Sequence, residues 1–138
     1  MNYKKIAVAI DFSEQSLKAL DRAIRIAVNN SATLVLVHVV DTKSFGAIAA
    51  YDPRYTKQLT SEGTVQLEEL KNKAQAEDVE NVELIIKEGS PKAILTTLPE
   101  VELMICGETG FSGVEKWMLG SVAERIVRYS KYDVLVVR

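Results

Sequence analysis

Cysteine, histidine and proline are scarce in this sequence, and neither sign of charge dominates. It contains one cysteine, one histidine and three prolines. A single cysteine cannot form an internal disulfide and cannot supply a cysteine-rich metal site. The 17 lysines and arginines stand against 19 aspartates and glutamates, which gives a net charge of −2. Nucleic-acid-binding proteins normally present a basic face, so this balance argues against a nucleic-acid partner.

Long apolar runs are also missing. No run approaches the roughly 18 residues that a membrane-spanning helix needs. The first apolar stretch, Ile6–Ile10, ends at an aspartate and is too short for the core of a signal peptide. We therefore expect a cytoplasmic protein with no membrane partner. The 138 residues, of which 47% are hydrophobic, fit a single domain with its own core over residues 1–138.

Five short apolar runs predict buried strands. They lie at residues 6–10, 33–40, 82–87, 102–106 and 133–137. Their apolar residues are consecutive rather than alternating, which is typical of strands covered on both faces. Segments with apolar residues at helical spacing lie between the runs. This alternation predicts an α/β fold, an open parallel five-stranded sheet with helices on both faces.

Capping residues predict where three of the helices begin. Ser13 is suited to cap the first helix. Ser90 followed by Pro91 is suited to begin the third helix, which we expect to continue to residue 98. Ser121 and Glu124 have the spacing of a capping box for the last helix.

The second helix has weaker signals. Leucines and alanines at helical spacing predict it from about Lys57 to Glu77, and Gly63 is expected to weaken its first turns. Residues 42–56 carry few pattern cues, so we expect a long connection there.

Two polar strand exits predict the order of the strands. Asp11 follows the first strand and Gly107 follows the fourth. Ligands of open α/β sheets bind beyond the carboxyl ends of the strands, where the strand order reverses. If both exits line one site, strands one and four are neighbours, which gives the order 3-2-1-4-5.

The glycine-rich stretch from Gly107 to Gly113 is the strongest candidate for a binding loop. Glycines let the backbone approach a ligand closely, and a position such as Gly110 is expected to use a positive φ. The helix expected to begin at Gly120-Ser121 offers free N–H groups and a partial positive charge, which attract phosphate. The alternative is a surface loop followed by a well-capped helix. The two standard phosphate-loop motifs are absent from this stretch.

The spacing of Gly107, Gly110, Gly120 and Ser121 resembles the G-x2-G-x9-G-[ST] nucleotide motif of the universal stress protein family, in its ATP-binding branch. The opening Ala9–Ser13, the strand end His38-Val39-Val40, the Gly89-Ser90-Pro91 turn and the final strand are also similar to that family. The resemblance covers essentially the whole chain. It implies a Rossmann-like fold of the adenine nucleotide alpha hydrolase type, with strand order 3-2-1-4-5. It also implies an adenine nucleotide as ligand, ATP or AMP or ADP, together with Mg²⁺.

The same resemblance implies a set of binding residues. Asp11 would lie near the ribose, the phosphates or the metal, Ala9 would border the adenine, and Val39 would offer backbone groups to it. The implied cofactor-binding set is Ala9, Asp11, Val39, Gly107, Thr109, Gly110, Ser112, Gly113, Gly120, Ser121 and Val122. Glu108 places a carboxylate inside the loop, which is unfavourable near polyphosphate unless it points outward or meets a metal.

The remaining chemical groups favour structural interpretations. A lone histidine in an apolar strand, His38, is expected to be a satisfied core residue, and Cys106 a buried thiol. Trp117 is expected to pack or to anchor its loop. One histidine leaves no visible Ser/His/Asp set, and catalysis by Asp11 is a minor alternative to a capping or turn role.

These observations favour a nucleotide-binding stress or signalling protein in which ATP marks a state. One rival is a slow ATPase or nucleotidyl-transfer enzyme that uses Asp11 and a divalent metal. Another is a nucleotide-free dimeric interaction module. The apolar strand 133–137 lies at the sheet edge in the expected order, without a proline or a central charge. It therefore predicts a homodimer through paired edge strands.

Overall fold

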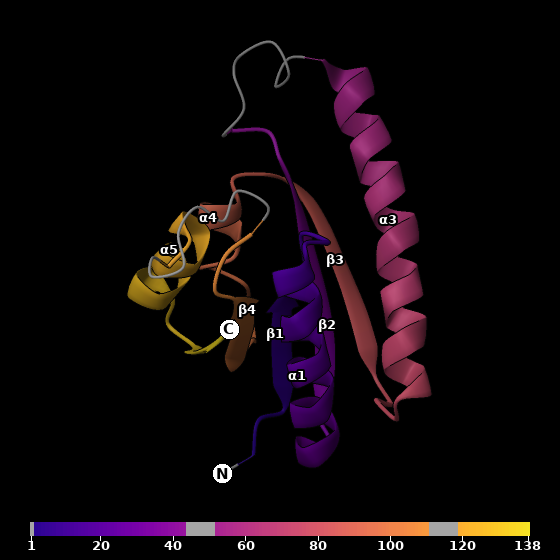
Figure 1. Ribbon diagram of the computed structural model, residues 1–138, viewed down its shortest axis with the longest axis vertical. Helices are drawn as coiled ribbons and strands as arrows, with labels where there is room; N and C mark the ends of the chain where they lie inside the picture. Colours follow the sequence, from indigo (N-terminus) through magenta and orange to yellow (C-terminus); the bar gives the residue numbers. More distant parts are fainter. Residues whose placement is uncertain (1, 44–51, 111–118) are drawn as a thin grey trace.

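The computed structural model describes residues 2–43, 52–110 and 119–138, and these form one five-stranded parallel sheet with helices on both faces (Figure 1). The strands are β1 (Lys5–Ala9), β2 (Thr33–Asp41), β3 (Val82–Gly89), β4 (Leu103–Gly107) and β5 (Asp133–Val137). The helices are α1 (Glu14–Asn30), α3 (Pro53–Ala76), α4 (Pro91–Ile94) and α5 (Ser121–Tyr129). The strand order is β3-β2-β1-β4-β5, which confirms the expected fold and order.

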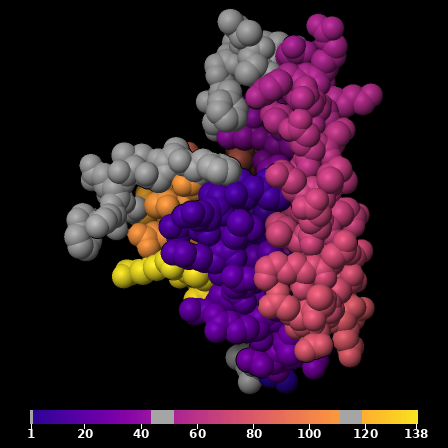
Figure 2. All heavy atoms as spheres, turned by 45° about the vertical axis from the view of Figure 1, so that its right-hand side comes forward, coloured from indigo at the N-terminus to yellow at the C-terminus, as the bar shows by residue number. Residues whose placement is uncertain are grey.

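Two hydrophobic clusters, one on each face, explain why the strand sequences are continuously apolar. Ile6 and Val8 of β1 belong to the cluster beneath α1 and α3, whereas Ala7 between them belongs to the cluster beneath α4 and α5. Successive side chains of a strand point to opposite faces, so a strand covered on both faces needs an apolar residue at every position. Figure 2 shows α1 and α3 side by side on one surface, where Lys73 forms an ion pair with Asp21 at 3.0 Å.

Helix α1 begins where the sequence predicts. The side chain of Ser13 accepts a hydrogen bond from the backbone N–H of Ser16, as an N-cap residue does. At the other end, Ser31 has a left-handed backbone with φ 52°, and its N–H reaches back to carbonyls of the last turn.

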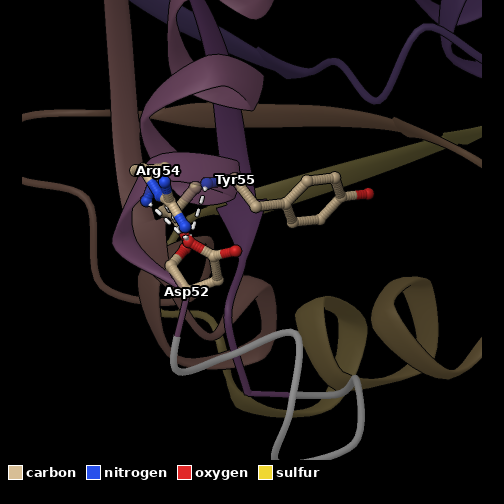
Figure 3. Close-up of polar contacts among 4 residues, drawn as sticks. Asp52, Arg54 and Tyr55 are labelled. Atoms are coloured by element: carbon tan, nitrogen blue, oxygen red, sulfur yellow. Dashed lines mark hydrogen bonds and ion pairs between the residues drawn. The ribbon is translucent and has the colours of Figure 1, made fainter.

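Helix α3 begins four residues earlier than expected, so the long connection predicted through residue 56 is wrong at its end. Asp52 is the N-cap: its Oδ1 accepts from the N–H of Arg54 at 3.0 Å and of Tyr55 at 3.4 Å (Figure 3). Pro53 then occupies the first helical position. A backbone N–H there would have no intrahelical acceptor, so the N–H that proline lacks is not missed. The helix also runs without interruption past Gly63.

Two further expectations are wrong in detail. Helix α4 ends at Ile94 instead of reaching residue 98. In α5 the N-cap is Gly120, so Ser121 is already helical and the predicted capping box with Glu124 does not form. Strand boundaries differ by one or two residues: β1 ends at Ala9 and β3 continues to Gly89. Within the described part of the chain, no helix is long and apolar enough to cross a membrane.

Candidate functional site

The loops after β1 and β4 leave the sheet side by side. The two strands are paired in parallel, with Ile6 opposite Leu103 and Val8 opposite Ile105. Both strands therefore deliver their carboxyl ends to the same edge, at the point where the strand order reverses. This register confirms the prediction that the first and fourth strands are neighbours.

Asp11 lies against the glycine loop. Its Oδ1 accepts a hydrogen bond from the N–H of Ser13 at 2.9 Å and another from the Ser13 hydroxyl. Its Oδ2 faces Gly110 so closely that a Cβ added at that glycine would lie 2.5 Å from it. Only a residue without a side chain leaves this carboxylate where it is. The structure thus brings Asp11 and Gly110 together, although they lie far apart in sequence.

The other two motif glycines serve contacts within the protein. A Cβ at Gly107 would lie 2.9 Å from the backbone carbonyl of Gln15, so this glycine lets α1 pack against the end of β4. A Cβ at Gly120 would lie 3.2 Å from Thr109 Cα, and the Gly120 N–H donates to the Glu108 carbonyl at 2.8 Å. Gly120 thereby holds the start of α5 beside the loop that follows β4.

The expected positive φ at Gly110 is wrong. Among the described glycines, Gly89 alone has a φ in the left-handed region, at 144°. Close approach, and not an unusual backbone conformation, is therefore what requires glycine at position 110.

The first turn of α5 presents backbone donors near this loop. Gly120 has φ −60° and ψ 153° and no side chain with which to cap the helix. The first N–H groups of a helix have no intrahelical acceptor and carry a partial positive charge. Ser121 and Val122, both in the predicted binding set, belong to this turn.

An apolar surface lies next to these polar groups. Ala9, Val39, Leu119 and Val122 are partly buried and pack against the cluster beneath α4 and α5. Ala9 is the last residue of β1 and Val39 lies near the end of the adjacent β2. The structure therefore places Ala9, Val39 and Val122 of the predicted set on one face of the sheet, at its carboxyl edge.

Glu108 is directed toward a positive charge. Its carboxylate lies 3.8 Å from Nε of Arg138, and its N–H donates to the Val137 carbonyl at 2.9 Å. The carboxylate expected to be unfavourable inside a phosphate loop thus has a long, exposed ion pair with the residue that follows β5.

Three of the residues singled out from the sequence lie beyond the part of the chain that the structure describes. Ser112 and Gly113 of the binding set, and Trp117, lie outside the described residues. Over residues 2–43, 52–110 and 119–138, no three His, Cys, Asp or Glu side chains gather as a metal cluster would require. The metal position implied by the resemblance therefore consists of Asp11. Cys106 is a buried thiol, as expected, and burial raises its pKa to about 11.

Three residues that contact or adjoin Asp11 are not in the binding set predicted from the sequence. The Oγ of Ser16 accepts from the Asp11 N–H at 3.3 Å, Phe12 has a positive φ of 65°, and His38 binds the Ile10 carbonyl. The Asp-x-Ser pattern at positions 11–13 is a turn signal, and Phe12 is the residue at its centre. Nothing in the local sequence links His38 to this turn, because the contact joins two strands.

Comparison with known proteins gives concordant results over the full length. The model of the universal stress protein family matches residues 2–138. A Staphylococcus saprophyticus protein named "putative universal stress protein" is 37% identical, covering all of this chain and 85% of the relative. Universal stress protein UspA from Lactobacillus plantarum has a TM-score of 0.84 and 25% identity, covering 100% of this chain and 99% of its own. A universal stress protein solved in complex with cAMP has a TM-score of 0.73 and 28% identity, covering 100% and 99%.

Proposed function

Because the chain belongs to the universal stress protein family, we propose that it binds an adenine nucleotide of the ATP, ADP or AMP type and acts in the cytoplasm as a nucleotide-dependent stress regulator. We further propose that residues 1–138 form one such domain. The observation that carries the proposal is the contact between Asp11 and Gly110, which brings the exits of β1 and β4 into one site.

The chemistry of the surrounding residues suits the three parts of a nucleotide. The first turn of α5, with Ser121 and Val122, offers N–H groups to phosphate oxygens. The Asp11 carboxylate, with Oδ2 facing the glycine loop, is suited to accept from ribose hydroxyls or to meet a phosphate-bound Mg²⁺. Ala9 and Val39 offer an apolar surface to the adenine ring. The cAMP complex of a relative supports an adenine nucleotide as the ligand class.

Binding without rapid turnover is the version of this function that the residues favour. The chain contains one histidine, and its Nδ1 is engaged with the Ile10 carbonyl at 2.7 Å. General acid–base catalysis needs a group within reach of the reacting proton. Asp11, whose carboxylate accepts from the Ser13 N–H, is our candidate for slow hydrolysis, and the experiment below distinguishes that alternative.

A homodimer through β5 completes the proposal. This strand is the sheet edge beside β4, and its sequence Asp133–Val137 has no proline. An edge strand presents unpaired N–H and C=O groups that a second copy can satisfy. Antiparallel pairing of β5 with itself about a two-fold axis would close the assembly.

Mass analysis of the small molecules released from freshly purified protein tests the ligand directly. We expect an adenine nucleotide, and we expect added Mg-ATP at about 100 times its Kd to stabilise the fold by about 2.7 kcal/mol. Protein that releases no nucleotide and shows no thermal shift with ATP, ADP or AMP would point to the nucleotide-free module. ATP turnover above background that disappears in Asp11→Asn would point to the enzyme.

A further inference from the structure

The chain's one histidine reaches across from β2 to the turn that carries Asp11. Nδ1 of His38 lies 2.7 Å from the carbonyl oxygen of Ile10. A carbonyl oxygen only accepts, so Nδ1 carries the proton and donates it. The N–H of the same peptide unit, that of Asp11, donates to Ser16 Oγ at 3.3 Å. The peptide that precedes Asp11 is therefore held at its oxygen and at its nitrogen.

The residue that follows Asp11 also depends on His38. Phe12 has φ 65°, a left-handed conformation that is strained for a bulky side chain. Its ring lies 4.7 Å from the His38 ring, centroid to centroid, at 51°. Strained backbone persists only where its surroundings hold it. His38 thus contacts the residue before Asp11 and the residue after it, so it supports the backbone on both sides of Asp11.

Helix α3 holds the histidine ring from the side opposite this turn. A Cβ at Gly63 would lie 2.9 Å from His38 Cδ2, 3.1 Å from Nε2 and 3.3 Å from Ile86 Cδ1. Glycine is unfavourable inside a helix, yet α3 is continuous through Gly63. The physical reason for glycine at this position is the room that it leaves for the imidazole.

We propose that His38 is a positioning residue of the nucleotide site and that Gly63 fixes its ring. Through these two residues, the seating of α3 on the sheet determines where Asp11 lies relative to Gly110. The effect on affinity rests on the proposed function, since it requires that Asp11 meets the nucleotide. The effect of His38 on the conformation of the turn does not rest on the proposed function.

Two substitutions at position 38 separate the effect of the hydrogen-bond donor from the effect of the volume of the ring. His38→Leu fills a similar volume without a donor, whereas His38→Asn keeps an amide nitrogen at the position of Nδ1. We expect His38→Leu to weaken ATP binding about tenfold, which corresponds to the loss of about one hydrogen bond, and His38→Asn to restore most of it. In an Asp11→Asn background, His38→Leu should add little, because it acts through Asp11.

Gly63→Ala gives a second test that changes neither His38 nor any residue of the predicted binding set. Alanine is the better helix former, so a purely helical role predicts a more stable protein with unchanged affinity. We expect ATP affinity to fall instead, because the new methyl group displaces the imidazole. Ser61→Ala, at an exposed position of the same helix, is the matched control and should leave affinity unchanged.

Hydrogen exchange at the amides of Asp11 and Ser13 distinguishes failure of this inference from failure of the proposed function. If the wild type binds ATP and folded His38→Leu and Gly63→Ala bind it equally well, the positioning role is overturned. If the wild type binds no adenine nucleotide, the proposed function fails. The exchange rates then decide the positioning role: faster exchange at these two amides in His38→Leu supports it, and unchanged exchange overturns it.

Discussion

Gly107 and Gly110 lie three residues apart, yet their missing side chains make room for different neighbours. At Gly107 the neighbour is the backbone of Gln15, which cannot move without displacing α1. At Gly110 it is one oxygen of the Asp11 side chain. The first glycine therefore contributes to stability and the second to the site.

This difference predicts that a substitution at Gly110 lowers nucleotide affinity, whereas a substitution at Gly107 lowers stability. In Gly110→Val the new side chain displaces the Asp11 carboxylate, so we expect nucleotide affinity to fall about ten- to a hundredfold. In Gly107→Ala the clash is with backbone, and we expect a loss of about 1–3 kcal/mol in the free energy of unfolding. Calorimetric titration and urea unfolding of both variants measure the two effects. A folded Gly110→Val protein with wild-type affinity would remove this glycine from the site.

Removing the Glu108 carboxylate tests whether its charge opposes the ligand. Its ion pair with Arg138 is long, and the arginine is almost fully exposed, so the pair adds little to stability. We expect Glu108→Ala to unfold at nearly the wild-type urea concentration and to bind nucleotide as tightly or more tightly. A clear loss of affinity in the presence of Mg²⁺ would show that the carboxylate helps to hold the metal.

The buried thiol of Cys106 predicts a loss of stability at alkaline pH. Burial raises its pKa from 9.0 to about 11, so the folded protein holds this proton more tightly than the unfolded chain. The resulting stability is complete below pH 9 and is lost as the pH rises through 11. Urea midpoints measured from pH 8 to 11 should fall less steeply in Cys106→Ala. Equal slopes in the two proteins would contradict the prediction.

Among the elements, the turn between β1 and α1 joins helix capping to the site. Ser13 caps α1 and also donates its hydroxyl to Asp11. We expect Ser13→Ala to lower the free energy of unfolding by about 1 kcal/mol and to weaken nucleotide binding as well. Ser90→Ala, which removes the N-cap of the four-residue α4, is the control and should leave binding unchanged. Titration of both variants would contradict the link if Ser13→Ala bound normally.

The element boundaries show where local sequence signals suffice. Ser13 was predicted as a cap because its side chain can satisfy a nearby N–H whatever the rest of the chain does. Ser121 has the same chemistry, yet Gly120 holds the N-cap position because its N–H binds the Glu108 carbonyl. That contact comes from a distant strand exit. The start of α3 at Asp52-Pro53 was within reach of local reasoning, since both residues are typical there.

At the scale of the molecule, the strand order was predicted from the assumption that two polar strand exits line one site. The register between β1 and β4 confirms that inference. The contacts of His38 with Ile10 and Phe12 could not be predicted in this way. They depend on the register of β2 against β1 and on the exact seating of α3, which periodicity does not specify.

The pairing of β5 with β4 determines which backbone groups remain for a partner. The Asp133 N–H donates to the Glu102 carbonyl at 3.2 Å, and the Val137 carbonyl accepts from the Glu108 N–H at 2.9 Å. In a parallel pair, alternate residues direct both their backbone groups to the same neighbour. Val134 and Val136 therefore direct theirs away from β4, toward the edge at which no strand of the described residues pairs.

Val136→Pro consequently tests the proposed dimer without breaking the sheet. Proline removes an outward N–H and is tolerated on the open side of an edge strand. We expect light scattering at micromolar concentration to give a dimer mass for the wild type and a monomer mass for folded Val136→Pro. Leu135→Pro, one residue away, removes a donor to β4 and should unfold the protein. A monomeric wild type would refute the edge pairing, and a folded, dimeric Val136→Pro would place the interface elsewhere.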